Sequence, residues 1–478
     1  MEGEFGVTSK VELNTFLRAA KRSCAMAVVL GGTFGMAALA GGGTAYAADT
    51  AVAGTAKPAP AAEETPIESV LGPYADLGGL RSALKEKGIT FELNYTGEVL
   101  SNTSGGVKRG TIYDGLLKLD VDADLGKLVG WNGATFHVSA LQIHGRGLST
   151  YNLENLMTAS NIEAVPSTRL DELWLEQSLL GDKVAIRVGM LAADSTFLAS
   201  DYAGTFVNAT FGFPAIAGVA LPNGGPAYPY TTPGVLVTLK PTDALSFMVE
   251  VQGSDPFGDH SNNYGANFRL DGSAFVIAEG KYSYKIGDLP GAVHIGGWYD
   301  GDNFADQRFT AAGLSIADPA SSGEGKWHRG NYSIYAMLDQ MLYHVPGTDD
   351  QGLGMFVRAA YSPPNRNLVD VYVDGGFTYK GLIPGRPNDV IGIAGAYAHI
   401  SGDVAGLDRD TIAFTGTPMP VRDYEALIEA TYQAEIVPGL TMQPDFQYIF
   451  HPGGNVADAS GRKIKDAAVF GLRFAMKF

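Results

Sequence analysis

The sequence predicts an all-β fold, a transmembrane antiparallel β-barrel of about 16 strands preceded by a short N-terminal periplasmic helix. Two observations support this prediction. From residue 89 onward, nearly every apolar segment alternates apolar and polar residues with a period of two, whereas no long segment has the helical period. The links between these segments mostly alternate between short and long, as the periplasmic turns and external loops of outer-membrane barrels do.

The composition excludes several classes of protein. The chain has 478 residues, of which 45% are hydrophobic and 18% charged, with a single Cys and a formal net charge of −17. The low charge content and the many aromatic residues argue against disorder, and one Cys argues against a disulfide scaffold. A nucleic-acid-binding protein needs a basic face, which so acidic a chain lacks. We therefore expect no nucleic-acid partner.

The residues before the alternating pattern divide into three parts. Residues 1–47 are predicted to be a signal peptide, because a basic stretch and a small-residue apolar stretch lead to the cleavage motif Ala45-Tyr46-Ala47. Residues 48–66 are rich in Ala and Pro and are expected to form a disordered leader. Residues 67–88 are predicted to be a periplasmic helical segment, and 89–478 the barrel in the bacterial outer membrane.

The alternation also predicts which face of each strand meets lipid. Between residues 424 and 436, Tyr424 and Ile428 alternate with Glu425 and Glu429. We expect the glutamates to face the lumen, because a register slip by one residue would move carboxylates into hydrocarbon at a cost of up to about 3 kcal/mol each.

The last predicted strand favours a membrane protein over a soluble sandwich. Five large apolar side chains share one face of residues 466–478, and the chain stops at Phe478. A soluble protein rarely exposes such a face, whereas a lipid-facing strand requires one. In the strand before it, Pro444 cannot donate to the sheet ladder, so we expect a β-bulge there.

The link 192–233 is the most informative loop of the sequence. Its seven Phe and Tyr residues lie among Asp and Asn residues, so it is too apolar to extend freely into water. Folding inward against the barrel wall would bury these aromatic residues and narrow the channel. Packing over the mouth of the barrel, or at an interface between copies, is the alternative.

Polar residues on the lumen face and in this loop form the candidate site. An aromatic ring flanked by charged side chains suits a sugar, whose C–H face stacks while its hydroxyls donate and accept hydrogen bonds. For any one residue, the simpler interpretation is a solvated charge in the lumen. The residues predicted to line the solute path are Trp174, Glu176, Arg187, Asp201, Asn208, Arg358, Asp339 and Glu279.

The sequence contains few features that are typical of enzymes or metal sites. The sequence has no zinc-protease motif, no nucleophile elbow and no phosphate-binding loop. The run Asp300-Gly301-Asp302-Asn303 has some features of a calcium loop but lacks the following glycine and the distal glutamate. We therefore expect no enzyme activity, no cofactor and no metal site.

Several stretches, in order along the chain, resemble the carbohydrate-selective porins of the OprB type. This resemblance implies a barrel of 16 strands that admits monosaccharides such as glucose, with arginine and acidic lumen residues at its narrowest point. It also implies that Pro444 is an ordinary feature of the family. The stretches are Gly78-Gly79-Leu80-Arg81, Glu172-Leu173-Trp174-Leu175-Glu176-Gln177, Arg187-Val188-Gly189, Ser200-Asp201-Tyr202, Phe206 to Gly212, and Gln443-Pro444-Asp445 with Gln447-Tyr448.

Two other functions stay open at this point. The negative net charge of the chain is compatible with a general or cation-preferring porin. Such a porin differs from a carbohydrate-selective one in that sugars do not block its ion current. A barrel enzyme would need Ser and His together on the lipid face, and the alternation places no such pair there. The expected partners are monosaccharides, outer-membrane lipid or lipopolysaccharide, and the barrel assembly machinery through the strand ending at Phe478. A homo-oligomer of the chain is also compatible with the sequence.

Overall fold

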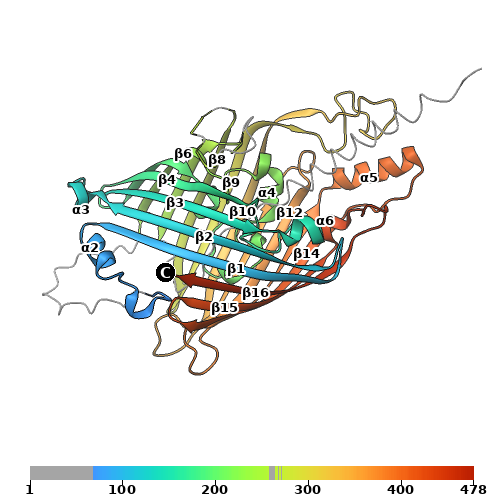
Figure 1. The fold of residues 1–478 in the computed structure, drawn as a ribbon. Helices are drawn as coiled ribbons and strands as arrows, with labels where there is room; N and C mark the ends of the chain where they lie inside the picture. Colours follow the sequence, from blue (N-terminus) through green and yellow to red (C-terminus); the bar gives the residue numbers. More distant parts are fainter. Residues whose placement is uncertain (1–67, 258–263, 267, 271) are drawn as a thin grey trace, which may run out of the picture.

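The computed structural model describes residues 68–478 apart from 258–263, 267 and 271. The predicted signal peptide and leader lie outside these residues. The described chain forms a closed antiparallel barrel in which each strand pairs with the next and β1 pairs with β16, as Figure 1 shows. The antiparallel barrel and the number of strands predicted from the sequence are confirmed.

The strands are β1 (Ile89–Gly106), β2 (Gly110–Asp124), β3 (Ala134–Gly145), β4 (Ser167–Leu179), β5 (Val184–Leu191), β6 (Thr232–Thr242), β7 (Leu245–Gly253), β8 (Ala274–Ile286), β9 (Leu289–Ala305), β10 (Trp327–His344), β11 (Gly352–Tyr361), β12 (Val369–Lys380), β13 (Val390–Ile400), β14 (Tyr424–Val437), β15 (Leu440–Phe450) and β16 (Lys465–Lys477). The α-helices are α2 (Leu80–Glu86), α3 (Leu125–Val129), α4 (Ala215–Ala220), α5 (Gly402–Thr415) and α6 (Pro452–Asn455). The shorter helical turns are η1 (Gly72–Tyr74), η2 (Ser149–Leu153), η3 (Ala193–Ser195), η4 (Ala203–Thr205), η5 (Ala209–Phe211) and η6 (Pro222–Gly224).

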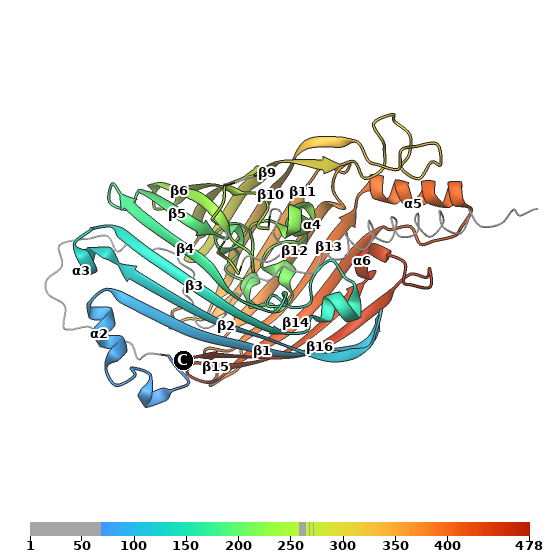
Figure 2. The ribbon, with the colours of Figure 1, turned by 45° about the horizontal axis from the view of Figure 1, so that its top comes forward.

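The two ends of the barrel differ. The C-terminus and α2 lie at one end, where most links are short; we call it the short-turn end (Figure 1). The longer links and helices α5 and α6 lie at the other, the long-loop end (Figure 2). None of the helices in the described part of the chain is long and apolar enough to cross a membrane.

The alternation along the strands places side chains as the sequence predicted. In β14, Glu425 and Glu429 are fully buried inside the barrel, whereas Ile428 between them is 46% exposed on the outer surface. In β16, Phe470 and Leu472 are exposed on the outer surface and Arg473 is buried inside. The register predicted for β14 is therefore confirmed.

The prediction of a β-bulge at Pro444 is wrong. Pro444 pairs with Leu472 of β16 in an unbroken register, and the pairing of β15 with β14 keeps the same register on both sides of it. Next to it, Gln443 Nε2 donates to Thr431 Oγ1 at 2.9 Å, which adds a side-chain link between β14 and β15. The missing N–H of the proline is thus accommodated without an extra residue.

The segment before β1 is attached to the end of β16. The N–H of Val70 donates to the carbonyl oxygen of Lys477 at 2.8 Å, and the guanidinium of Arg81 donates to Phe478 O. The same guanidinium lies 4.7 Å from the ring centre of Phe91 in β1. These contacts reinforce the seam at which the first and last strands close the barrel.

Candidate functional site

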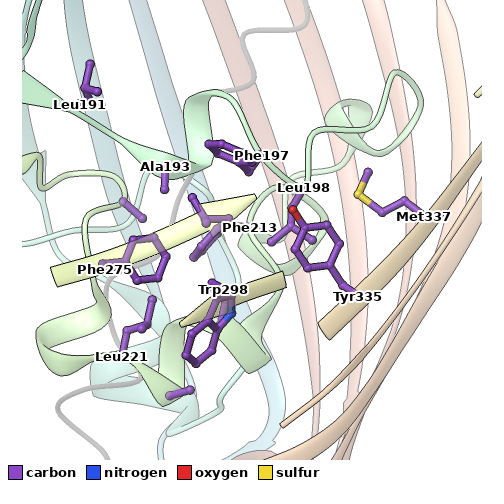
Figure 3. Close-up of a cluster of buried hydrophobic side chains, with 14 of the residues drawn as sticks. Leu191, Ala193, Phe197, Leu198, Phe213, Leu221, Phe275, Trp298, Tyr335 and Met337 are labelled. Atoms are coloured by element: carbon purple, nitrogen blue, oxygen red, sulfur yellow. The ribbon is translucent and has the colours of Figure 1, made fainter. Parts of the chain in front are cut away.

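Residues 192–231, between β5 and β6, fold into the lumen, and we call them the inserted loop. Its side chains Phe197, Leu198 and Phe213 pack against lumen-facing residues of β8, β9 and β10, among them Trp298 and Tyr335 (Figure 3). Phe197 and Phe213 are each only 1% exposed. These aromatic side chains of the loop are therefore buried inside the barrel. This inward folding is one of the two alternatives expected from the sequence.

A second aromatic group fixes the middle of the inserted loop. The ring of Phe206 lies 4.9 Å from that of Phe211, and both contact Phe356 of β11. Beside them, Tyr202 lies over Gly354, where an added Cβ would come within 1.9 Å of its ring. Only glycine at 354 allows this close approach of loop and wall.

Carboxylates of the barrel wall accept hydrogen bonds from the backbone of the inserted loop. Glu279 of β8 accepts from the N–H of Leu198 at 3.2 Å, and Asp339 of β10 from the N–H of Asp201 at 3.1 Å. Glu429 of β14 accepts from two successive loop N–H groups at 2.6 and 3.0 Å. These acids satisfy loop amides that would otherwise be buried without a partner.

Arg358 of β11 holds the same loop by donating hydrogen bonds to its carbonyl oxygens, whereas the carboxylates accept from its N–H groups. Its Nη1 donates to the carbonyl oxygens of Leu198 and Gly212 at 3.0 and 2.8 Å, and its Nη2 donates to that of Thr210 at 2.9 Å. Its Nε and Nη2 donate to the carboxylate of Asp374. All five N–H bonds of the guanidinium are therefore occupied, and none is left for a solute.

A second loop, residues 146–166 between β3 and β4, packs against the inserted loop. The N–H of Asn161 donates to Val207 O at 2.8 Å, and the N–H of Ala209 donates to Thr158 O at 2.9 Å. Burial raises the pKa of Glu163 in this loop to about 7, although it accepts from the N–H of Ser149. The two loops form one packed unit inside the long-loop half of the barrel.

The wall formed by β2 to β5 carries charged side chains that stay partly exposed. Arg187 Nε donates to Glu176 Oε2 at 2.9 Å, and these side chains are 21% and 25% exposed. On β2, Lys118 forms an ion pair with Asp120 at 3.1 Å. We call these residues of β2, β4 and β5 the charged wall; together they offer both donors and acceptors to the lumen.

Trp174 is placed differently from the sequence prediction of a ring open to a sugar. The ring of His137, from the neighbouring β3, stacks on it at 4.7 Å, and the guanidinium of Arg187, from β5 on the other side, lies 4.0 Å from its centre. Because these groups come from the two flanking strands, both ring faces are covered. Trp174 therefore positions Arg187 instead of offering a free stacking surface.

Seven of the eight predicted residues thus fall into two groups, and Asp201 stands apart. Trp174, Glu176 and Arg187 lie on the charged wall, where they meet one another. Asn208, Arg358, Asp339 and Glu279 are at most 3% exposed and bind the inserted loop to the wall. Asp201 is exposed on the loop itself.

Sequence reasoning missed some residues of this region. Lys118 and Asp120 lie on the polar face of a predicted strand, which was a usable signal for the charged wall. His137 had no such signal, because its role depends on the neighbour across the sheet.

Burial raises the pKa of Asp194, in the inserted loop, to about 7, and this carboxyl accepts from the N–H of Tyr228. Among the described residues, no group of three or more His, Cys, Asp or Glu could hold a metal ion.

Comparisons with known proteins agree on one family. Residues 108–478 match the family model of the carbohydrate-selective porins, OprB family. The chain is similar to Porin B of Pseudomonas aeruginosa, with 28% identity over 83% of this chain and 90% of that protein.

Solved structures show the same fold. A high-pH structure of Pseudomonas putida OprB matches with a TM-score of 0.77 and 24% identity, covering 84% of this chain and 97% of that one. A low-pH structure of the same protein matches with a TM-score of 0.53 and 20% identity over the same shares. These structures support the fold, and the family match, together with the closed barrel, places the protein in the bacterial outer membrane as a channel and not an enzyme: the chain belongs to the OprB family of carbohydrate-selective porins.

Proposed function

We propose that this porin passes monosaccharides such as glucose by passive diffusion, and that the charged wall and the inserted loop form the selective part of the path. The observation that carries the proposal is the partly exposed Arg187–Glu176 pair, fixed against Trp174 on one side of a lumen whose other side is filled by the inserted loop.

The Arg187–Glu176 pair suits sugar hydroxyls. A hydroxyl both donates and accepts, so one hydroxyl donates to Glu176 while a neighbouring one accepts from Arg187. Each charged group already has a partner in the empty channel, at 2.9 Å. A sugar therefore exchanges one set of hydrogen bonds for another, and the net binding is weak.

Weak binding is what a diffusion channel needs. A solute must bind well enough to enter and loosely enough to leave. We expect a dissociation constant for glucose in the millimolar range, which corresponds to about 4 kcal/mol. The inserted loop supports selection by size, because its anchors on the strands from β8 to β15 hold it in place.

The experiment is single-channel recording in planar bilayers with and without glucose. Glucose is expected to reduce the current of the wild-type channel with a millimolar midpoint. Arg187→Ala is expected to weaken this block without loss of folded barrel, because lumen substitutions affect selectivity more than stability. A current that ignores glucose but discriminates sharply between potassium and chloride would instead identify a cation-preferring porin.

A further inference from the structure

Three segments that meet at the long-loop end carry an unusual set of cations. They are the β1–β2 turn, the start of the loop after β3, and the link between β15 and β16. The N–H of Lys108 donates to Asn152 O at 3.0 Å, and Lys465 pairs with Gly106 across the barrel seam. We call the exposed cations of these segments the basic rim: Lys108, Arg109, Arg146, Arg462, Lys463 and Lys465.

The basic rim contrasts with the rest of the molecule. The chain as a whole has a net charge of −17, yet in these three segments the acids Glu154, Asp458 and Asp466 are each partly buried while all six cations are exposed. Asp458 is engaged by the N–H groups of Ser460 and Arg462, at 2.8 and 3.0 Å. The local surface is therefore positive.

Arg462 of the rim forms a long ion pair with Asp458 at 3.8 Å, and other arginines at the same end are paired more closely. Arg308 donates twice to Asp410, at 2.8 and 2.9 Å, and Arg422 donates twice to Asp408, at 2.9 and 2.7 Å. Within the described part of the chain, no ion pair involves the side chains of Lys108, Arg109, Lys463 or Lys465. These four cations remain available to an external anion.

The outer surface of β1 to β3 near the rim carries polar and aromatic side chains that bond one another. On the lipid-facing side of β1 to β3, the hydroxyl of Tyr95 bonds the hydroxyl of Tyr113 and, at 3.1 Å, His144 Nε2. Closer to the rim, the hydroxyls of Ser101 and Thr111 bond each other at 2.9 Å. Aromatic and polar side chains of this kind are typical of the interfacial girdle of a membrane barrel, the level at which lipid headgroups lie.

Arginine and exposed lysines favour phosphate among anions. A guanidinium matches two phosphate oxygens, and ammonium groups add positive charge around them. Arg146 is also held in place, since its guanidinium lies 4.4 Å from the ring centre of Tyr151. Clusters of four or more basic residues at a membrane surface recognise anionic headgroups.

We propose that the basic rim binds the phosphorylated headgroup of an outer-leaflet glycolipid, as lipopolysaccharide has, and so anchors the β1–β16 seam in the outer leaflet. The lipid is favoured over a soluble phosphate compound because Lys108, Arg109 and Arg146 lie at the long-loop ends of β1 to β3, the strands whose outer surface carries Tyr95, Tyr113 and His144. The proposal is independent of which sugar passes through the channel.

The test measures binding of diphosphorylated lipid A to the detergent-purified full barrel by native mass spectrometry. The rim variant combines Lys108→Gln, Arg109→Gln, Lys463→Gln and Lys465→Gln. The matched control combines Lys85→Gln, Lys87→Gln, Lys183→Gln and Lys285→Gln, four exposed cations at the short-turn end. Heat-modifiable migration on a gel checks that each variant is a folded barrel.

We expect the rim variant to bind diphosphorylated lipid A at least tenfold more weakly than the wild type, and the control variant to bind it equally well. Dephosphorylated lipid A should not distinguish the three proteins, and raising the salt concentration should weaken only the phosphorylated complex. Equal binding by the rim variant would overturn the proposal. Displacement of the lipid by millimolar inorganic phosphate would overturn it as well, since the site would then be a free-anion site.

Discussion

Arg358 is the residue whose removal tests most sharply how the inserted loop is held. Arg358→Met keeps much of the side-chain volume but removes every hydrogen bond of the guanidinium. Three backbone carbonyls of the loop, at Leu198, Thr210 and Gly212, lose their donor, and Asp374 is left buried without its cation. The change therefore acts on the anchoring of the loop and not on the exposed charged wall.

The structure sets the size of this effect. Removing one partner of a buried ion pair costs about 3 to 5 kcal/mol, because the other charge stays buried. Since each 1.4 kcal/mol is a factor of ten, local opening of the loop should become roughly a hundred to a few thousand times more frequent. The double variant Arg358→Met/Asp374→Leu should recover part of this loss, because it leaves no unpaired buried charge.

Hydrogen–deuterium exchange of the loop amides measures this opening directly. Residues 198–212 should exchange faster in Arg358→Met, while amides in the strands keep their wild-type protection. Arg187→Ala is the matched control, because that guanidinium contacts Glu176 and Trp174 and not the loop. Unchanged exchange of residues 198–212 in Arg358→Met would refute the assignment of Arg358 as the anchor.

Three further results are expected. Deleting about 15 residues between 208 and 226 should raise ion conductance and lower sugar discrimination; an unchanged conductance would show that the loop does not limit the pore. Trp174→Ala should weaken glucose block less than Arg187→Ala, and the double variant should lose no more than Arg187→Ala alone, because Trp174 acts through Arg187. Burial raises the pKa of Glu163 from 4.5 to about 7, so between pH 4.5 and about 7 the folded state keeps a proton on Glu163 that the unfolded state has lost. The free energy of unfolding should therefore fall by at most about 3 kcal/mol as the pH rises through this range. Glu163→Gln should remove that part of the pH dependence of the melting temperature, and an identical pH profile would contradict it.

The period-two pattern was sufficient to predict the barrel, because strand residues have only two faces and a slip by one residue moves every side chain to the wrong one. It placed Glu425 and Glu429 inside the barrel correctly. It could not predict the hydrogen bonds of Arg358, since knowing which face of the strand a residue occupies does not show which loop covers it. The three carbonyls that bind Arg358 lie about 150 residues away in the sequence.

Other differences have equally local causes. Trp174 was predicted to present an open ring, but its two neighbours across the sheet, His137 and Arg187, cover both faces. Such pairs depend on strand register, which a single sequence specifies only approximately. The helix α5 was not predicted, although Ser401 caps it by accepting from the N–H of Val404 at 3.3 Å. Its apolar residues are too few to give a clear helical period.

The central claim is that the charged wall and the inserted loop select monosaccharides, and the rate of vesicle swelling in sugar solutions tests it most directly. Proteoliposomes with the wild-type porin should swell much faster in glucose than in a disaccharide of equal osmolarity. With Arg187→Ala this ratio should fall, while the control variant at the short-turn end, with Lys183 and Lys285 replaced by Gln, should keep it. Equal swelling of wild-type vesicles in glucose and in the disaccharide would contradict the account.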